Sequence, residues 1–352
     1  MTYVQKPRPA LAWEKTNSLG LTRRDYEGSL STLCAGCGHD SITAAIVKAF
    51  FELEVPPHQV VKISGIGCSS KTPAYFLRTA HGFNSVHGRM PSIATGANAA
   101  NSDLVCVGVS GDGDSLSIGL GQFAHAVRRN MNMLYIIENN GVYGLTKGQF
   151  SASADVGSKA KKGEVNQQSP IDPMLLTLSL GASFVARSFS GDKAQLVPLI
   201  KAGIRHKGFA LIDVMSPCVT FNDHEDSTKS YSYMRRYHHP AVQADFIAPA
   251  ATIQASGGEH GEAIPVQLHD GSRIMLRKAA PDYDPTDRAA AFEYIERHQR
   301  RGEVVTGLLY INEQRSSMHD LAGTVNSPLT EMAYEKLSPG SKTLADIQKA
   351  YR

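Results

Sequence analysis

Two polar motifs, each placed just after an apolar segment, constrain the fold of this chain more than any other feature. Gly111-Asp112-Gly113-Asp114 follows the apolar segment 104–109, and Asn139-Asn140 follows the apolar segment 133–137. Residues 115–129, between the motifs, read as a helix. A strand, a helix and a strand in this order are typical of a βαβ unit, whose two parallel strands end at the same edge of a sheet. We therefore expect the two motifs to meet at that edge.

The residue types in these motifs suit a metal ion bound to a diphosphate. Glycines allow backbone N–H groups to approach a phosphate closely. Asp112 and Asn140 carry hard oxygen atoms, which are the ligands that Mg²⁺ prefers. The alternative for each motif alone is an ordinary turn, because Gly, Asn and Asp are common turn residues. The pair of motifs, with 25 residues between Gly113 and Asn139, resembles the pattern of thiamine diphosphate enzymes.

Further alternation of helical and strand patterns predicts an α/β protein with a doubly wound parallel sheet and a C-terminal extension. The resemblance to thiamine diphosphate enzymes implies that this sheet has the thiamine diphosphate-binding fold. We expect helix 40–51 to begin with Asp40 or Ser41 as its N-cap. The other expected elements are strand 60–63, helix 91–101, helix 172–181, strand 183–187, helix 192–204, strand 209–215, helix 285–300 and strand 304–312. We divide the chain into an N-terminal arm (1–30), a cofactor-binding domain (31–240) and the C-terminal extension (241–352), which we expect to pack on the core or on a partner subunit.

Four of the five cysteines are candidate metal ligands, and unligated cysteines are the alternative. Cys34 and Cys37 form a C-x-x-C pair, and Cys68 and Cys218 follow as single residues. Four thiolates hold either one [4Fe–4S] cluster or a structural zinc ion, although zinc sites usually contain two C-x-x-C pairs. Cys106 lies inside an expected strand and reads as a small buried hydrophobic residue.

The order of these motifs resembles the β subunits of 2-oxoacid:ferredoxin oxidoreductases of the 2-oxoglutarate type. The run C-x-x-C-G-H, G-I-G-C, H-G-R, GDGD, NN and a late cysteine matches that family over residues 25–240. The resemblance implies CoA-dependent oxidative decarboxylation of a 2-oxoacid, with electron transfer through a [4Fe–4S] cluster to ferredoxin, in either direction. It also implies an α subunit, which supplies the carboxylate that activates thiamine diphosphate, in an (αβ)₂ assembly.

The resemblance also implies the roles of individual residues. The cluster ligands are Cys34, Cys37, Cys68 and Cys218, and the Mg²⁺ ligands are Asp112, Asn140 and the carbonyl of Val142. Thiamine diphosphate is bound by Gly38, His39, Gly67, Ser69, His87, Gly88, Gly111, Asp112, Gly113, Asp114, Asn140, Val142, Gly144, Leu145 and Thr146. The last three belong to a glycine-rich loop (141–149) that resembles the family's loop over the diphosphate.

Lys71, His87 and Arg89 are the candidate catalytic residues. Lys71 follows Cys68 by three positions, and its charge suits the distal carboxylate of 2-oxoglutarate; the alternative is an exposed loop lysine. Arg89 suits a phosphate or a substrate carboxylate. A histidine at position 39 or 87 would bond a phosphate or move a proton, and a structural role for His39 is the alternative.

Composition excludes other classes of function. The net charge of +3 with mixed charges gives no nucleic-acid-binding pattern, and no run of eighteen apolar residues suggests a membrane span. We expect no export signal, and an odd number of cysteines favours a reducing compartment, so the expected location is the cytoplasm. Two alternatives remain for the function: a non-redox thiamine diphosphate decarboxylase or carboligase with structural cysteines, and a zinc-binding interaction subunit.

Overall fold

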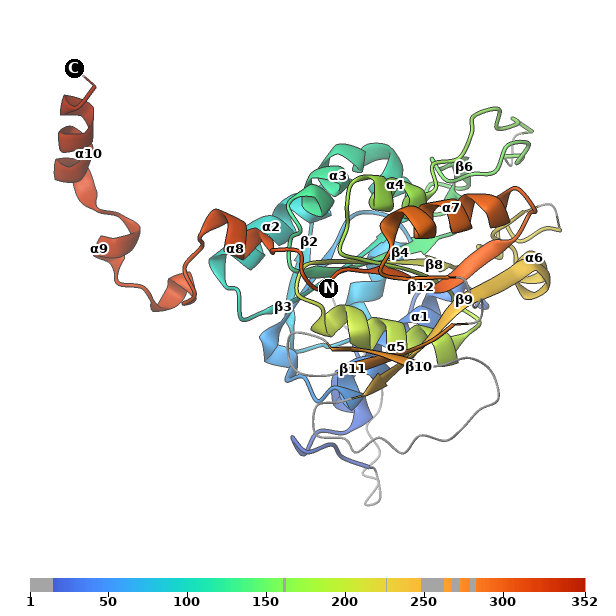
Figure 1. The fold of residues 1–352 in the computed structure, drawn as a ribbon, viewed down its shortest axis with the longest axis horizontal. Helices are drawn as coiled ribbons and strands as arrows, with labels where there is room; N and C mark the ends of the chain where they lie inside the picture. The colour runs from blue at the N-terminus through green and yellow to red at the C-terminus, as the bar shows by residue number, and fades with distance from the viewer. Residues whose placement is uncertain are drawn as a thin grey trace.

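The computed structural model describes residues 15–160, 163–225, 227–247, 263–267, 273–278 and 283–351. Its centre is a ten-stranded sheet with the order β10-β11-β9-β12-β7-β8-β4-β3-β1-β2. Six neighbouring strands, from β7 to β2, are mutually parallel, and β12 joins them antiparallel to β7. The predicted doubly wound parallel sheet is therefore confirmed (Figure 1).

The parallel strands are β1 (Val60–Ser64), β2 (His81–Asn84), β3 (Val105–Gly111), β4 (Met133–Asn139), β7 (Phe184–Phe189) and β8 (Phe209–Met215). The sheet continues through β12 (Val304–Ile311), β9 (His238–Ile247), β11 (Arg273–Lys278) and β10 (Ala263–Gln267). A separate two-stranded sheet pairs β5 (Val142–Tyr143) with β6 (Gln149–Phe150). Strands β4, β7 and β8 are buried along their whole length, because helices cover both faces of the sheet.

Helices α1 (Gly38–Glu52) and α5 (Lys193–Arg205) pack together on one face of the sheet. The other face carries α2 (Met90–Ala100), α3 (Leu120–Arg128), α4 (Pro173–Ser179) and α7 (Arg288–Gln299) (Figure 1). Aspartates cap three of these helices: Asp172, Asp192 and Asp287 each accept hydrogen bonds from backbone N–H groups of the first turn. Such caps satisfy donors that have no partner inside the helix.

Two helix starts differ from the sequence prediction. The N-cap predicted at Asp40 or Ser41 is wrong, because α1 begins at Gly38 with Cys37 as its N-cap. The first four residues of the predicted helix 115–129 belong to a π-helical turn (Gly113–Ile118), and the α-helix proper begins at Leu120. The wider turn begins at the last residue of the GDG motif, and turns of this kind are frequent at functional sites.

The C-terminal part of the chain adds to the same sheet and then leaves it. The proposed boundary at residue 240 falls within β9, and the division into three regions stays a prediction; residues 1–14 of the predicted arm lie outside the described residues. Helix α6 (Tyr231–Tyr237) directly precedes β9, and α8 (Met318–Ala322), α9 (Tyr334–Leu337) and α10 (Gly340–Lys349) follow β12. Figure 1 shows α9 and α10 leading away from the sheet.

A search of the described residues for a helix of the length and apolarity that a bilayer span requires found none.

Candidate active site

The GDG and NN motifs meet at the carboxyl ends of β3 and β4, which are neighbouring parallel strands. The buried carboxylate of Asp112 accepts hydrogen bonds from the backbone nitrogens of Asn140 (3.2 Å) and Gly141 (3.1 Å). The side-chain oxygen of Asn140 accepts one hydrogen bond from Val142 N at 3.1 Å, which leaves it a second lone pair. A carboxylate, an amide oxygen and a nearby backbone carbonyl form a donor set that fits Mg²⁺.

A small cavity of about 80 Å³ lies beside these motifs. Tyr143 closes one side: its hydroxyl donates a 2.9 Å hydrogen bond to the carbonyl oxygen of Gly113. Eleven of the predicted cofactor-binding residues line the cavity together with Ile66, Cys68 and Tyr143, namely Gly67, Ser69, His87, Gly111, Gly113, Asp114, Asn140, Val142, Gly144, Leu145 and Thr146. Glycine backbone at this position fits a diphosphate, because it leaves N–H groups open to approach.

Asp114 ties three segments together at the cavity. Its carboxylate accepts hydrogen bonds from Ser110 Oγ (2.6 Å), Gly88 N (2.7 Å) and Ile66 N (3.1 Å). The Nδ1 atom of His87 lies against the same carboxylate. A fully engaged carboxylate of this kind holds the cavity walls in place and has little capacity left for a ligand.

The four predicted metal-ligand cysteines gather at the edge of this cavity. Cys68 lines the cavity, and a methyl group at Gly144 would lie 3.5 Å from Cys68 Sγ and 3.7 Å from Cys218 Sγ. The hydroxyl of Thr220, just beyond Cys218, lies 3.7 Å from Cys34 Sγ. Burial raises the pKa of the Cys37 thiol to about 12, with further contributions from Glu138 and Cys218. Cys106 is buried elsewhere, in β3.

The four sulfurs are spaced more widely than the ligands of one zinc ion. Within the described part of the chain, no three of the four sulfurs lie within 4.8 Å of one another. Ligands of one tetrahedral zinc ion would be about 3.8 Å apart, since the Zn–S distance is about 2.3 Å. A [4Fe–4S] cluster binds each cysteine to a different iron atom and so accepts wider spacing.

A group of buried polar residues joins the start of α1 to the end of β4. His39 Nδ1 shares a 2.6 Å hydrogen bond with Ser216 Oγ and lies 3.5 Å from the carboxylate of Glu138. Its Nε2 atom is 3.2 Å from Ser69 Oγ, which lines the cavity. Burial lowers the pKa of His39 to about 4 and raises the pKa of Glu138, so burial disfavours the charged form of both.

Several predicted site residues lie away from the cavity. Among the described residues, its lining does not include Gly38, His39, Lys71, Gly88, Arg89 or Asp112. Lys71 Nζ instead donates a 3.2 Å hydrogen bond to Thr32 Oγ1, beside the loop that leads to Cys34. Arg89 is exposed at the start of α2. Gly88 and Asp112 reach the cavity indirectly, through Asp114 and Asn140. The assigned roles of all these residues stay predictions.

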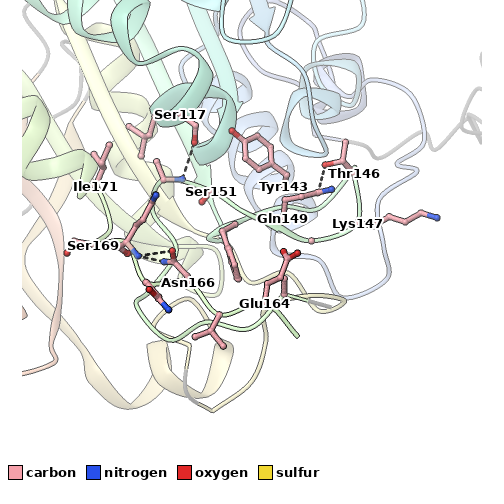
Figure 2. Close-up of a pocket in the computed structure, with 18 residues that line it drawn as sticks. Ser117, Tyr143, Thr146, Lys147, Gln149, Ser151, Glu164, Asn166, Ser169 and Ile171 are labelled. Atoms are coloured by element: carbon pink, nitrogen blue, oxygen red, sulfur yellow. Dashed lines mark hydrogen bonds between the residues drawn. The ribbon is translucent and has the colours of Figure 1, made fainter. Parts of the chain in front are cut away.

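The outer side of the glycine-rich loop faces a much larger cavity, of about 1200 Å³. Figure 2 shows Thr146 and Gln149 on one side of this cavity and Asn166 and Ser169 across it. Thr146 Oγ1 donates a 2.6 Å hydrogen bond to the side chain of Gln149, which ties the loop to itself. The loop therefore separates two cavities, the small one at the metal motifs and this open one.

Sequence reasoning missed several residues of the site. Ser151 and Ser153 donate hydrogen bonds to Asp112, and Ser216 bonds to His39. No motif marks these serines, since they reach the site only after the loop folds back. Glu138 could have been found from the sequence, because it is a carboxylate at the end of an otherwise apolar strand, directly before the paired asparagines.

Comparison with known proteins places this geometry among thiamine diphosphate enzymes. Residues 65–214 match the family described as "Thiamine pyrophosphate enzyme, C-terminal TPP binding domain". The chain is 39% identical over 269 residues to a Sulfolobus 2-oxoacid:ferredoxin oxidoreductase subunit beta, which covers 75% of this chain and 87% of that protein. It is 43% identical over 191 residues to the 2-oxoglutarate oxidoreductase subunit KorB of Mycobacterium tuberculosis, 54% of this chain and 51% of that one.

A solved structure is similar over almost the whole length. It is the 2-oxoglutarate:ferredoxin oxidoreductase from Magnetococcus marinus, solved with 2-oxoglutarate, coenzyme A and succinyl-CoA bound. The TM-score is 0.70 at 31% sequence identity, and the match covers 88% of this chain and 90% of that one.

Proposed function

This chain belongs to the β subunits of the 2-oxoacid:ferredoxin oxidoreductases, and we propose on that basis that it binds thiamine diphosphate, Mg²⁺ and one [4Fe–4S] cluster. Its proposed reaction converts 2-oxoglutarate and CoA to succinyl-CoA and CO₂, while two oxidised ferredoxins each accept one electron. The reverse reaction, a reductive carboxylation, follows when the electron carrier is sufficiently reducing. Both 2-oxoglutarate and CoA are ligands of the solved Magnetococcus marinus relative.

The observation that carries this proposal is that the cofactor cavity and the cysteine group share residues. Cys68 and Gly144 both line the cavity, and Gly144 also lies against the sulfurs of Cys68 and Cys218. A [4Fe–4S] cluster bound by these cysteines would therefore adjoin the cavity, where it could accept electrons from the substrate. A thiamine enzyme without a redox step does not require a cysteine group beside its cofactor cavity.

The residues of this chain have distinct proposed tasks. When bound, thiamine diphosphate supplies the electron sink for decarboxylation, Mg²⁺ neutralises its diphosphate, and the cluster carries single electrons. Asp112, Asn140 and Val142 would hold the metal ion. The backbone of Gly111 and Gly113 would approach the diphosphate, and the loop 141–149 would exclude water from it.

Lys71 is the proposed determinant of substrate choice. Its ammonium donates an exposed hydrogen bond to Thr32 on the cysteine side of the site, and an ammonium there suits the second carboxylate of 2-oxoglutarate. A Lys71→Met variant is expected to raise KM for 2-oxoglutarate about tenfold or more, which is the size of a charge-assisted hydrogen bond, and to leave pyruvate turnover unchanged. Equal loss with both substrates would contradict this role.

A partner subunit completes the proposed site. The one carboxylate among the described cavity-lining residues is Asp114, and it is already bonded to Ile66, Gly88 and Ser110. We therefore propose that another chain supplies the carboxylate that activates the cofactor. We propose an α subunit in an (αβ)₂ assembly, with ferredoxin as the electron acceptor; the cytoplasmic location stays a prediction.

Anaerobic purification of the chain with its partners tests this function. Iron, zinc and thiamine diphosphate per chain are measured for the wild type, for Cys218→Ala and for Cys106→Ala. We expect about four irons and one thiamine diphosphate per chain in the wild type and in Cys106→Ala. In Cys218→Ala we expect loss of iron with thiamine diphosphate retained.

Each of the other outcomes would indicate a different function for this protein. Thiamine diphosphate without iron in the wild type would indicate a non-redox decarboxylase or carboligase. Zinc without thiamine diphosphate would indicate an interaction subunit that has no catalytic role. Given the expected cofactors, bleaching of the cluster absorbance by 2-oxoglutarate plus CoA then tests the reaction itself.

A further inference from the structure

The carboxylate of Asp112 is bonded asymmetrically. Among the described residues, Oδ1 accepts one hydrogen bond, from Asn140 N at 3.2 Å. Oδ2 accepts three, from Gly141 N at 3.1 Å, Ser153 Oγ at 2.7 Å and Ser151 Oγ. Asp112 is 1% exposed, so water does not supply further donors freely.

This asymmetry limits how the carboxylate can bind a metal ion. A carboxylate oxygen has two lone pairs, so three donors already exceed the capacity of Oδ2, while Oδ1 retains one lone pair. Asp112 therefore presents a single oxygen to a cation. Bidentate coordination would require Oδ2 to give up the hydroxyl of Ser151 or Ser153.

Mg²⁺ and Ca²⁺ respond differently to such a restriction. Mg²⁺ demands near-octahedral coordination at short distances and takes single carboxylate oxygens. Ca²⁺ accepts six to eight ligands, often with bidentate carboxylates. A carboxylate held to one available oxygen thus favours the smaller ion.

We propose that Ser151 and Ser153 are positioning residues that set the cation specificity of the cofactor site, by occupying Oδ2 of Asp112 and so favouring Mg²⁺ over Ca²⁺. The inference rests on the proposed function, in which Asp112 binds the metal ion of thiamine diphosphate. Both serines lie outside the GDG and NN motifs, 39 and 41 positions after Asp112.

Neighbouring groups hold both hydroxyls in place. Ser151 Oγ accepts a hydrogen bond from Ser153 N at 3.3 Å, so its own proton is free for Asp112. Ser153 Oγ also lies 2.9 Å from Asn139 Oδ1, but the hydroxyl has one proton, and the shorter contact to the charged carboxylate takes it. Asn139 is fixed in turn by a 3.0 Å hydrogen bond to Asp213.

The assembled oxidoreductase tests the inference through cation-dependent retention of thiamine diphosphate, a readout that needs no turnover. The concentrations of Mg²⁺ and of Ca²⁺ that give half-maximal retention are measured by equilibrium dialysis. The variants are Ser151→Ala, Ser153→Ala and the double variant. The control is Ser188→Ala, because Ser188 is also buried but bonds to Gln195 in the core.

For the double variant we expect the preference for Mg²⁺ over Ca²⁺ to fall about tenfold or more, the usual size of an effect from a residue that bonds to a metal ligand. Each single variant should lower it by about threefold on the same scale, so the singles carry the test where the double variant does not fold. Ser188→Ala should keep the wild-type preference.

An unchanged Mg²⁺ to Ca²⁺ ratio in folded single and double variants would overturn the inference and leave the proposed function intact. A wild-type assembly whose thiamine diphosphate retention does not depend on any divalent cation would overturn the proposed function, and the inference with it.

Discussion

The hydroxyl of Tyr143 donates a 2.9 Å hydrogen bond to the carbonyl oxygen of Gly113. This contact joins the glycine-rich loop to the GDG motif, and it requires that residue 113 has no side chain. An ideal Cβ atom at Gly113 would lie 2.5 Å from the Tyr143 ring, well inside any real contact distance.

Gly113→Ala is therefore expected to displace Tyr143 and the loop, and to weaken thiamine diphosphate binding by at least about tenfold, the effect of roughly 1.4 kcal/mol. The matched control is Gly121→Ala in α3, where a Cβ atom meets nothing within 4 Å. The control should bind normally and gain slight stability, because alanine favours a helix over glycine. Calorimetric titration measures both; equal affinity in the two variants would contradict the steric argument.

Arg187 should contribute strongly to stability. Its guanidinium forms 2.8 Å ion pairs with Asp172, which caps α4, and with Asp213 in β8. All three groups are largely buried, so Arg187→Met leaves two carboxylates without their cation. We expect a loss of about 3–5 kcal/mol in the free energy of unfolding.

The control for this variant is Lys207→Met. Lys207 forms a 3.0 Å ion pair with Asp320, but both side chains are more than 40% exposed. Such a pair contributes less than about 1 kcal/mol, since water screens it. Denaturation curves of the two variants should therefore differ clearly, and similar curves would show that the buried network is dispensable.

Much of the fold could be predicted because its signals are local. The continuous apolar segments of β3, β4 and β8 identify buried parallel strands, and the motifs at their ends identify the edge where the site forms. The start of α1 has no capping signal, because Cys37 at the N-cap forms no side-chain hydrogen bond. Gly38, the first helical residue, packs closely on Ser190 and Ser216, which are distant in the sequence.

Only the site residues that belong to a sequence motif could be predicted. Asp112 and Asn140 are recognisable because residue type and spacing coincide. Ser151, Ser153 and Ser216 are not, because each meets its partner only through the folded path of a loop. Lys71 lies outside the cavity lining because a residue three positions from a predicted ligand can point to either side of its loop. Arg89 lies outside it at the exposed start of α2.

The C-terminal segment after residue 324 should be dispensable for the stability of this chain. The helices α9 and α10 contain no buried residue. A chain ending at residue 324 is expected to melt within about 1 °C of the full chain, because little apolar surface leaves water there. A chain ending at residue 316 is the control: it loses the buried Met318 and the 2.8 Å hydrogen bond between His319 and Asn98, so it should melt lower.

Lys62 should make the stability depend on pH in the alkaline range. It is 8% exposed in β1, and its ammonium donates a 2.6 Å hydrogen bond to the carbonyl oxygen of Phe76. Burial lowers the pKa of Lys62 from 10.5 to about 8. Between these values the unfolded chain binds a proton that the folded chain has released, so folding becomes more favourable as pH rises, by up to about 3 kcal/mol. Below pH 8 this contribution is absent.

Lys62→Met removes the titrating group and keeps an unbranched apolar side chain. Relative to this variant, the wild type should gain stability steadily from pH 8 to pH 10.5 and keep a constant difference below pH 8. Chemical denaturation of both proteins at pH 7, 8.5 and 10 measures the difference in their free energies of unfolding. The titration of all other groups is common to both proteins and cancels in this difference. A difference that stays flat to pH 10 would mean that the Lys62 ammonium is solvated in the folded protein and that its pKa is not lowered.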